Sequence, residues 1–194
     1  MTTPSNIFMI TPEILHQSAI TILEKYYPSG SHYRPKVNEE VQLNEIEQLK
    51  KNVKYEQFFF VLDLVGKKLT NVNGFSEWLG WADQSFSFFQ YFQILHSHFY
   101  DSIMQVAESS FEMANSQKFE IHFMKNSIVA LIALRHKNGK YFLVKRSLYP
   151  FQIDENGAVT AYLNYFVLIG EYQELGIRIA NGSQIFAMNE QTFF

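Results

Sequence analysis

The first part of the chain repeats apolar positions at the spacing of helices. Thr11-Pro12-Glu13 combines a good N-cap, a proline suited to the first helical position and an acid that meets the positive end of the helix dipole. Apolar residues then recur at helical spacing as far as Tyr26. A second helix is expected from Asn38 to about Lys51, and its thin apolar stripe suits a surface or partner-facing position.

The middle of the chain changes to strands and shorter helices. Phe58–Asp63 is an apolar run of strand length, and Lys68–Val72 alternates weakly, as a second strand does. The next helices are predicted over Ser76–Leu79, Ser85–Leu95 and His98–Asn115, the last with Ser97 as its cap.

Three long strands are predicted between about Ile128 and Ile169. Asn138-Gly139 predicts a two-residue type I′ turn, because Asn and Gly both reach positive φ at little cost. Asp154–Gly157 predicts a four-residue loop with acceptor side chains and a terminal glycine. Two strands, several helices and three strands in this order predict an α+β fold that contains an antiparallel meander.

Composition narrows the classes of function. The 194 residues include 19 Phe and 11 Tyr, so a core or a pocket must be rich in aromatic rings. The net charge of −3 gives no electrostatic footprint for nucleic acid. The absence of cysteine excludes disulfides, thiolate metal sites and cysteine nucleophiles. The sequence contains no signal-peptide pattern and no apolar run long enough for a bilayer, so we expect a soluble, cytoplasmic protein without a membrane partner.

Three segments of the chain resemble the PAS domain family. Arg135–Phe142 is similar to the family's basic residue, Asn-Gly and strand pattern, and Phe151–Val159 resembles its Asp-Glu-x-Gly turn before the last strand. Phe92–His96 resembles its apolar-apolar-His segment, although Ser97 and His98 stand where the family has Pro and Asp.

The resemblance covers Phe58 to Tyr172 and is closest to the N-terminal PAS sensor modules of LuxR-type transcription regulators. It implies a five-stranded antiparallel sheet with helices on one face, plus an N-terminal helical extension. The expected divisions are residues 1–54 for the extension, 55–172 for the PAS-like domain and 173–194 for a C-terminal tail. The sequence contains no basic recognition helix, so direct DNA binding is not expected, and the chain is either a sensor half or a stand-alone PAS protein.

A PAS-like cup often encloses a small molecule, and aromatic and polar residues of the sequence are candidates to line it. Its aromatic runs supply apolar walls, and the meander supplies polar groups. The candidate ligand-binding residues are Phe60, Phe89, Phe92, His96, Ile103, Arg135, Tyr149, Asn164 and Tyr165.

Metal and cofactor chemistry are alternatives to a simple ligand pocket. His96, His98 and Asp101 have the residue types of a metal site, but a helix cap with a surface histidine explains them as well. His96, His98 or His122 would be the axial ligand of a haem. Light-sensing flavin chemistry needs a cysteine, and the sequence contains none. The cofactor is therefore unknown, neither haem nor flavin is expected, and no metal ligand or catalytic residue is assigned.

The sequence predicts a sensory or regulatory domain and no enzyme. Such a domain binds a small molecule or a partner and relays the change, for example as the sensor half of a transcription regulator. A homodimer formed through the N-terminal helices is the expected partner arrangement. Two alternatives stay open: a PAS module that mediates protein interaction without a ligand, and a small α+β enzyme.

Overall fold

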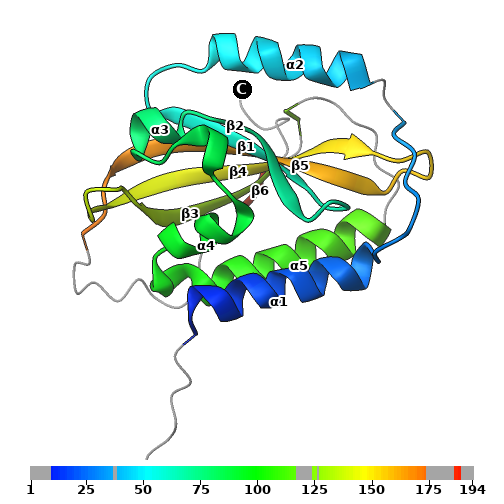
Figure 1. Ribbon diagram of the computed structural model, residues 1–194, viewed down its shortest axis with the longest axis horizontal. Coiled ribbons are helices and arrows are strands. Elements are labelled where there is room, and N and C mark those ends of the chain that lie inside the picture. The colour runs from blue at the N-terminus through cyan, green and yellow to red at the C-terminus, as the bar shows by residue number, and fades with distance from the viewer. Residues whose placement is uncertain (1–9, 37–38, 117–123, 126, 174–185, 189–194) are drawn as a thin grey trace, which may run out of the picture.

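The computed structural model describes residues 10–36, 39–116, 124–125, 127–173 and 186–188. It confirms the α+β class, with helices packed against an antiparallel sheet (Figure 1). The predicted C-terminal tail, residues 173–194, and His122 lie largely or wholly outside the described residues. Within those residues, no helix combines the length and the apolar character needed to cross a membrane.

Five strands form the predicted antiparallel sheet, in the spatial order β2-β1-β5-β4-β3. The short strand β6 (Phe186–Met188) adds to its edge by pairing with β3. The alternating and apolar runs of the sequence account for these strands, because β-branched and aromatic residues suit a pleated, buried surface. The strands span Gln57–Asp63 (β1), Lys68–Asn73 (β2), Ser127–Arg135 (β3), Tyr141–Ile153 (β4) and Val159–Glu171 (β5).

The turn between β3 and β4 differs from the predicted type I′ turn. Gly139 has a φ of 92°, whereas Asn138 is not among the residues of positive φ. The His136 amide donates to the Lys140 carbonyl at 2.8 Å, and the Gly139 amide donates to the His136 carbonyl at 2.9 Å. The turn is therefore a three-residue loop in which only the last residue needs a left-handed backbone. Asn138 supports it through its side chain, which accepts a hydrogen bond from the Lys140 amide.

The helices lie close to their predicted positions. Thr11 caps the first helix as expected, accepting from the Ile14 amide at 3.4 Å. Ser97 does not cap the helical segment that follows it: His96 does, because its side chain accepts from the His98 amide. The helices are α1 (Pro12–Tyr26), α2 (Glu39–Asn52), α3 (Phe75–Trp78), α4 (Phe88–Ile94) and α5 (Tyr100–Ser116), with 3₁₀ turns η1 (Asp83–Ser85) and η2 (Ser97–Phe99).

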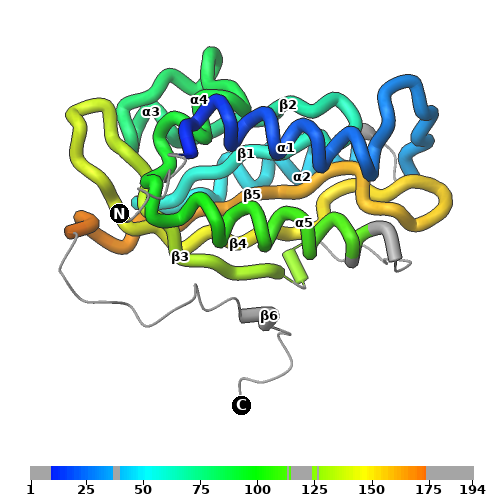
Figure 2. Tube along the Cα trace, turned by 90° about the horizontal axis from the view of Figure 1, so that it is seen from below, coloured from blue at the N-terminus to red at the C-terminus, as the bar shows by residue number. Residues whose placement is uncertain are grey.

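Helices cover both faces of the sheet. Helices α1 and α5 run side by side with α4 across one face, here called the inner face, and α2 crosses the other, the outer face (Figures 1 and 2). The N-terminal segment is therefore divided between the two layers. Helix α1 buries Leu15, Ala19 and Leu23 in the same core cluster as the inner-face residues of the sheet.

The thin apolar stripe of α2 is what covers the outer face. Ile46 and Leu49 are buried there. They form a second, smaller core cluster with Phe59, Val61, Phe151, Ala161 and Leu163 of the sheet. Val41 and Leu43 of the same helix stay about half exposed, at 50% and 55%.

Candidate ligand site

A cavity of about 40 Å³ lies between the inner face of the sheet and the helices α1, α4 and α5. We call it the aromatic cavity, since phenylalanine and tyrosine rings form much of its wall. Side chains alternate between the two faces of a strand, so every second residue of β4 and β5 lies on this face. The helices contribute their buried apolar residues. Its lining is Ala19, Leu23, Leu62, Phe88, Tyr91, Phe92, Ile103, Met104, Val106, Ala107, Ser110, Phe111, Arg146, Leu148 and Tyr162.

Arg146 is the one charged residue among the described residues that line the cavity. It lies in the middle of β4, half-buried, where Val144 and Leu148 share its face. Its Nε and Nη2 atoms donate to the Asn164 amide oxygen at 2.9 and 2.6 Å. Among the described residues no carboxylate lies within ion-pair distance of it, so a neutral amide is the polar partner that orients this guanidinium.

The hydroxyl group of Tyr91 is buried and has no hydrogen-bond partner among the described residues, and none of their other side-chain N or O atoms is buried in this way. Tyr91 comes from α4, is 2% exposed, and its ring centroid lies 5.8 Å from Cζ of Arg146. Burial raises the pKa of this phenol, and the Arg146 charge acts in the opposite direction. An unpaired buried hydroxyl is costly, so this group is available to a guest molecule.

The opposite wall of the cavity is already satisfied. The Tyr162 hydroxyl donates to the Ser110 carbonyl at 3.2 Å, and the Ser110 hydroxyl donates to the Ala107 carbonyl at 2.9 Å. Burial strongly raises the pKa of Tyr162, with the neighbouring Tyr27 adding to the effect, so the Tyr162 phenol stays neutral at physiological pH. The hydrogen-bond donors of the lining that are still available to a ligand therefore belong to Arg146 and Tyr91.

The structure brings four of the predicted ligand residues to this cavity or next to it. Phe92 and Ile103 line it. Asn164 is fully buried and holds Arg146, and Phe60 packs edge-on against the Tyr91 ring at 5.3 Å. These residues meet because Phe60 and Asn164 are direct partners in the β1–β5 pairing.

Three other predicted residues lie outside the cavity. Tyr149 and Tyr165 are on the outer face of the sheet, against the cluster under α2. Burial raises the pKa of Tyr165 there. Phe89 lies on α4 beside the ring of His16, with the two centroids 5.3 Å apart, and does not line the cavity.

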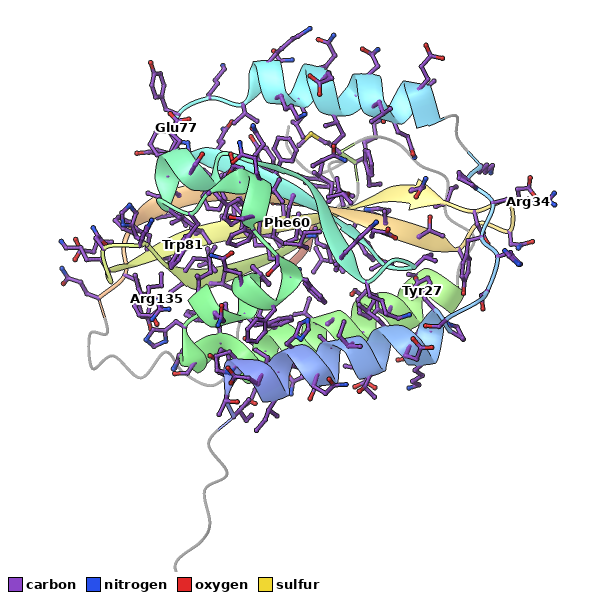
Figure 3. All side chains as sticks on the ribbon, viewed as in Figure 1. Tyr27, Arg34, Phe60, Glu77, Trp81 and Arg135 are labelled. Carbon is purple, nitrogen blue, oxygen red and sulfur yellow. The ribbon has the colours of Figure 1, made fainter. Side chains whose placement is uncertain are left out.

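His96 and Arg135 lie at another end of the inner face. His96 packs against the Tyr141 and Tyr172 rings, at centroid distances of 4.6 and 5.2 Å. The Arg135 guanidinium donates to the Gln93 carbonyl, and its carbonyl accepts from the Trp81 indole. Figure 3 shows Arg135 and Trp81 on one side of the molecule and Tyr27 on the other, with Phe60 between them.

Sequence reasoning missed Arg146, the principal polar residue of the cavity. The signal was present: Phe142, Val144, Arg146 and Leu148 alternate on one face of β4, so Arg146 interrupts an inward apolar series. The opposite series, with Leu143 and Tyr149, is also partly apolar and is interrupted by Lys145, so the sequence did not decide which face points inward.

A second hollow lies on the outer face, between α2 and the β1–β2 hairpin. It is larger, about 230 Å³, and includes Gln42, Asp63 and Asn71 in its lining. Two of these polar groups already have partners, since Gln42 donates to the Phe151 carbonyl and Asp63 accepts from the Gly66 amide. We therefore place the candidate site in the smaller aromatic cavity, whose lining includes the one buried hydroxyl of the described residues that lacks a partner.

The described residues hold no cluster of three or more His, Asp or Glu side chains arranged to bind a metal ion. The aromatic cavity, at about 40 Å³, has room for about three water-sized atoms. A haem or flavin ring system would enter only if α1 and α5 moved away from the sheet. Comparison with known proteins gives no further guide to the occupant: no protein-family model matches the chain, and no curated protein is significantly similar to it.

Proposed function

We propose that this chain is a PAS-like regulatory domain that binds a small molecule in the aromatic cavity. One observation carries the proposal: Tyr91, whose buried hydroxyl has no hydrogen-bond partner among the described residues, lines the same apolar cavity as Arg146. Ligand pockets combine mostly apolar walls with a few polar groups that fix orientation. Native cores normally satisfy their buried polar atoms, so an open donor beside a cavity favours a binding site over plain packing.

The same lining argues against the two alternative functions. An interaction module with a solid core has no reason to keep a cavity with an unsatisfied hydroxyl. An enzyme needs groups that transfer protons or act as nucleophiles, and a His–carboxylate pair is the usual signature. The described lining of the aromatic cavity contains no His, Asp or Glu.

We propose that ligand binding is relayed through the N-terminal helices. Helix α1 contributes Ala19 and Leu23 to the cavity wall, so a ligand that fills the cavity favours some positions of α1 over others. The segment after α1 passes the β4–β5 turn, where the Lys36 amide donates to the Ile153 carbonyl and the Glu155 amide donates to the Arg34 carbonyl. It leads to α2, whose exposed Val41 and Leu43 offer a contact for a second copy of the chain or for an output domain of a cytoplasmic regulator.

Native mass spectrometry tests the binding function. The purified protein, incubated with an extract of small metabolites, should carry an added mass that is lost on denaturation. Ala107→Leu should abolish the added mass, because Ala107 lines the cavity and the larger side chain fills it. Gln105→Leu, an exposed change on the same helix, is the matched control and should retain the added mass.

Either of two results would overturn the proposal. One is a bare protein mass after incubation with the extract. The other is an added mass that is equally retained by Ala107→Leu, since the molecule would then be bound elsewhere.

A further inference from the structure

We infer that the ligand of the aromatic cavity is a monoanion, a carboxylate on an apolar body, and that the end edge of the Arg146 guanidinium receives the carboxylate. This inference rests on the proposed binding function and adds the chemical class of the ligand. Four features of the described residues support it. They are the edge of the guanidinium that already forms hydrogen bonds, the lack of a neighbouring negative charge, the volume of the cavity and the single cation in its lining.

The first observation is the way Arg146 is held. Asn164 accepts from Nε and Nη2, which form the side edge of the guanidinium. Asn164 is fully buried, and its amide nitrogen donates to the Tyr162 carbonyl at 3.4 Å. The side edge is thus fixed by a rigid partner. The end edge, formed by Nη1 and Nη2, keeps donors that match the two oxygens of a carboxylate.

The second observation is the missing countercharge. The Asn164 oxygen is neutral, so it orients the guanidinium without balancing its charge. Ion pairs of the described residues join Lys25, Lys50, Lys67 and Lys140 to glutamates, and none involves Arg146. A half-buried cation surrounded by apolar and aromatic side chains is stabilised by an anion more than by a neutral polar group.

The third observation concerns size and the number of cations. The cavity has room for about three water-sized atoms, which is the size of a carboxylate group. Tyr91, whose hydroxyl has no partner among the described residues, lines the same cavity and offers a donor of the kind that a carboxylate oxygen accepts. Arg146 is the single cation in the described lining, so a dianion such as phosphate would keep an unbalanced charge in an apolar site. An apolar body attached to the carboxylate would lie against Phe88 and Phe92 and displace the flexible, half-buried Met104.

Calorimetric titration with hexanoate and hexanamide tests the inference. The two probes have the same shape and differ in charge. Wild-type protein should bind hexanoate at least about tenfold more tightly than hexanamide, because the bidentate pair is charge-assisted. Arg146→Gln should abolish this preference, and Arg146→Lys should retain part of it, since lysine keeps the charge and loses the fork. Arg135→Gln, which changes an arginine outside the cavity, should bind as wild type does.

The outcomes separate the ligand class from the binding function. Equal binding of both probes, or an unchanged preference in Arg146→Gln and Arg146→Lys, would overturn the carboxylate assignment and leave the cavity as a binding site. Binding of neither probe would also overturn the assignment, while the metabolite experiment with Ala107→Leu decides the binding function independently. Thermal unfolding of each variant shows whether it is folded, and Arg146→Lys is the smaller perturbation if Arg146→Gln is not.

Discussion

Tyr91 is distinguished from the buried tyrosines Tyr27 and Tyr162 by what its hydroxyl touches. The Tyr27 hydroxyl donates to the Val159 carbonyl at 2.6 Å, and that of Tyr162 donates to the Ser110 carbonyl. The Tyr91 hydroxyl has no such partner among the residues that the structure describes. A buried hydroxyl without a partner lowers the free energy of unfolding. A bound molecule that accepts its hydrogen bond would offset this cost.

Replacing these tyrosines by phenylalanine should therefore have different effects on stability. Tyr27→Phe should lower the free energy of unfolding by about 1–2 kcal/mol, because it leaves a buried carbonyl without its donor. Tyr91→Phe should change it by less than about 0.5 kcal/mol, or raise it, because no bond is lost. Urea denaturation of the ligand-free proteins measures both values. A loss for Tyr91→Phe equal to that for Tyr27→Phe would show that the Tyr91 hydroxyl is already bonded.

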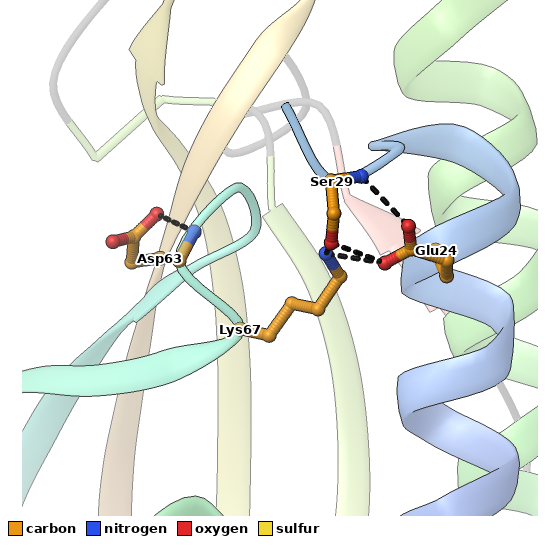
Figure 4. Close-up of polar contacts among 5 residues, drawn as sticks. Glu24, Ser29, Asp63 and Lys67 are labelled. Carbon is orange, nitrogen blue, oxygen red and sulfur yellow. Dashed lines mark hydrogen bonds and ion pairs between the residues drawn. The ribbon is translucent and has the colours of Figure 1, made fainter. Parts of the chain in front are cut away.

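At the scale of elements, a polar contact ties the end of α1 to the β1–β2 hairpin. Glu24 of α1 accepts from the Ser29 amide at 2.7 Å and from the Ser29 hydroxyl at 3.0 Å, and it pairs with Lys67 of the hairpin at 2.6 Å (Figure 4). The hydrogen bonds from Lys67 and Ser29 lower the pKa of Glu24 from 4.5 to about 2. The contact therefore favours the ionised carboxylate in the folded state.

The pKa of Glu24 predicts a pH dependence of stability. Its folded-state pKa is lower than its unfolded value, so the unfolded state binds the proton more readily and stability falls as pH falls. The stability that ionised Glu24 contributes should be complete above about pH 5 and be lost progressively as the pH falls through 4.5 to about 2. In urea denaturation as a function of pH, Glu24→Gln should lose part of this acid dependence. The exposed change Glu112→Gln should retain it, and identical pH profiles for Glu24→Gln and wild type would contradict the assignment.

The elements were more predictable than the way they pack. Helical spacing and the Thr11-Pro12-Glu13 start identified α1, and the apolar alternation identified the strands. The faces of β4 were not predictable, because both of its side-chain series are partly apolar, and a sheet covered on both faces shows little polar–apolar contrast. The candidate site shows the same limit. The sequence named Asn164, which bonds Arg146, but it pointed to Arg135, which lies beside the turn and away from the cavity, and not to Arg146.

At the scale of the whole molecule, the N-terminal helices take part in the packing of the sheet. Leu15, Leu23 and Tyr27 are at most 2% exposed and belong to the main core cluster. Removing residues 1–54 would therefore expose that cluster and destabilise the fold, so truncation is a poor test of dimer formation. Substitution of exposed residues on α2 is a better one, since Val41 and Leu43 are half exposed.

We predict a homodimer that depends on α2. The double change Val41→Glu and Leu43→Glu should convert the dimer to a monomer, because it places charge in a desolvated apolar contact. Light scattering coupled to size-exclusion chromatography measures the mass in solution. Gln48→Glu, an exposed polar position on the same helix, is the control and should leave the dimer intact. A monomeric wild type, or a dimer unaffected by the double change, would refute this arrangement.

The most direct test of the aromatic cavity as a carboxylate site is a two-dimensional ¹H–¹⁵N NMR titration of the labelled protein with hexanoate. We predict saturable shifts that are largest at Tyr91, Ala107, Arg146 and Tyr162, the residues around the cavity on α4, α5, β4 and β5. Absence of saturable shifts, or shifts grouped around Gln42 and Asn71 in the hollow under α2, would contradict it.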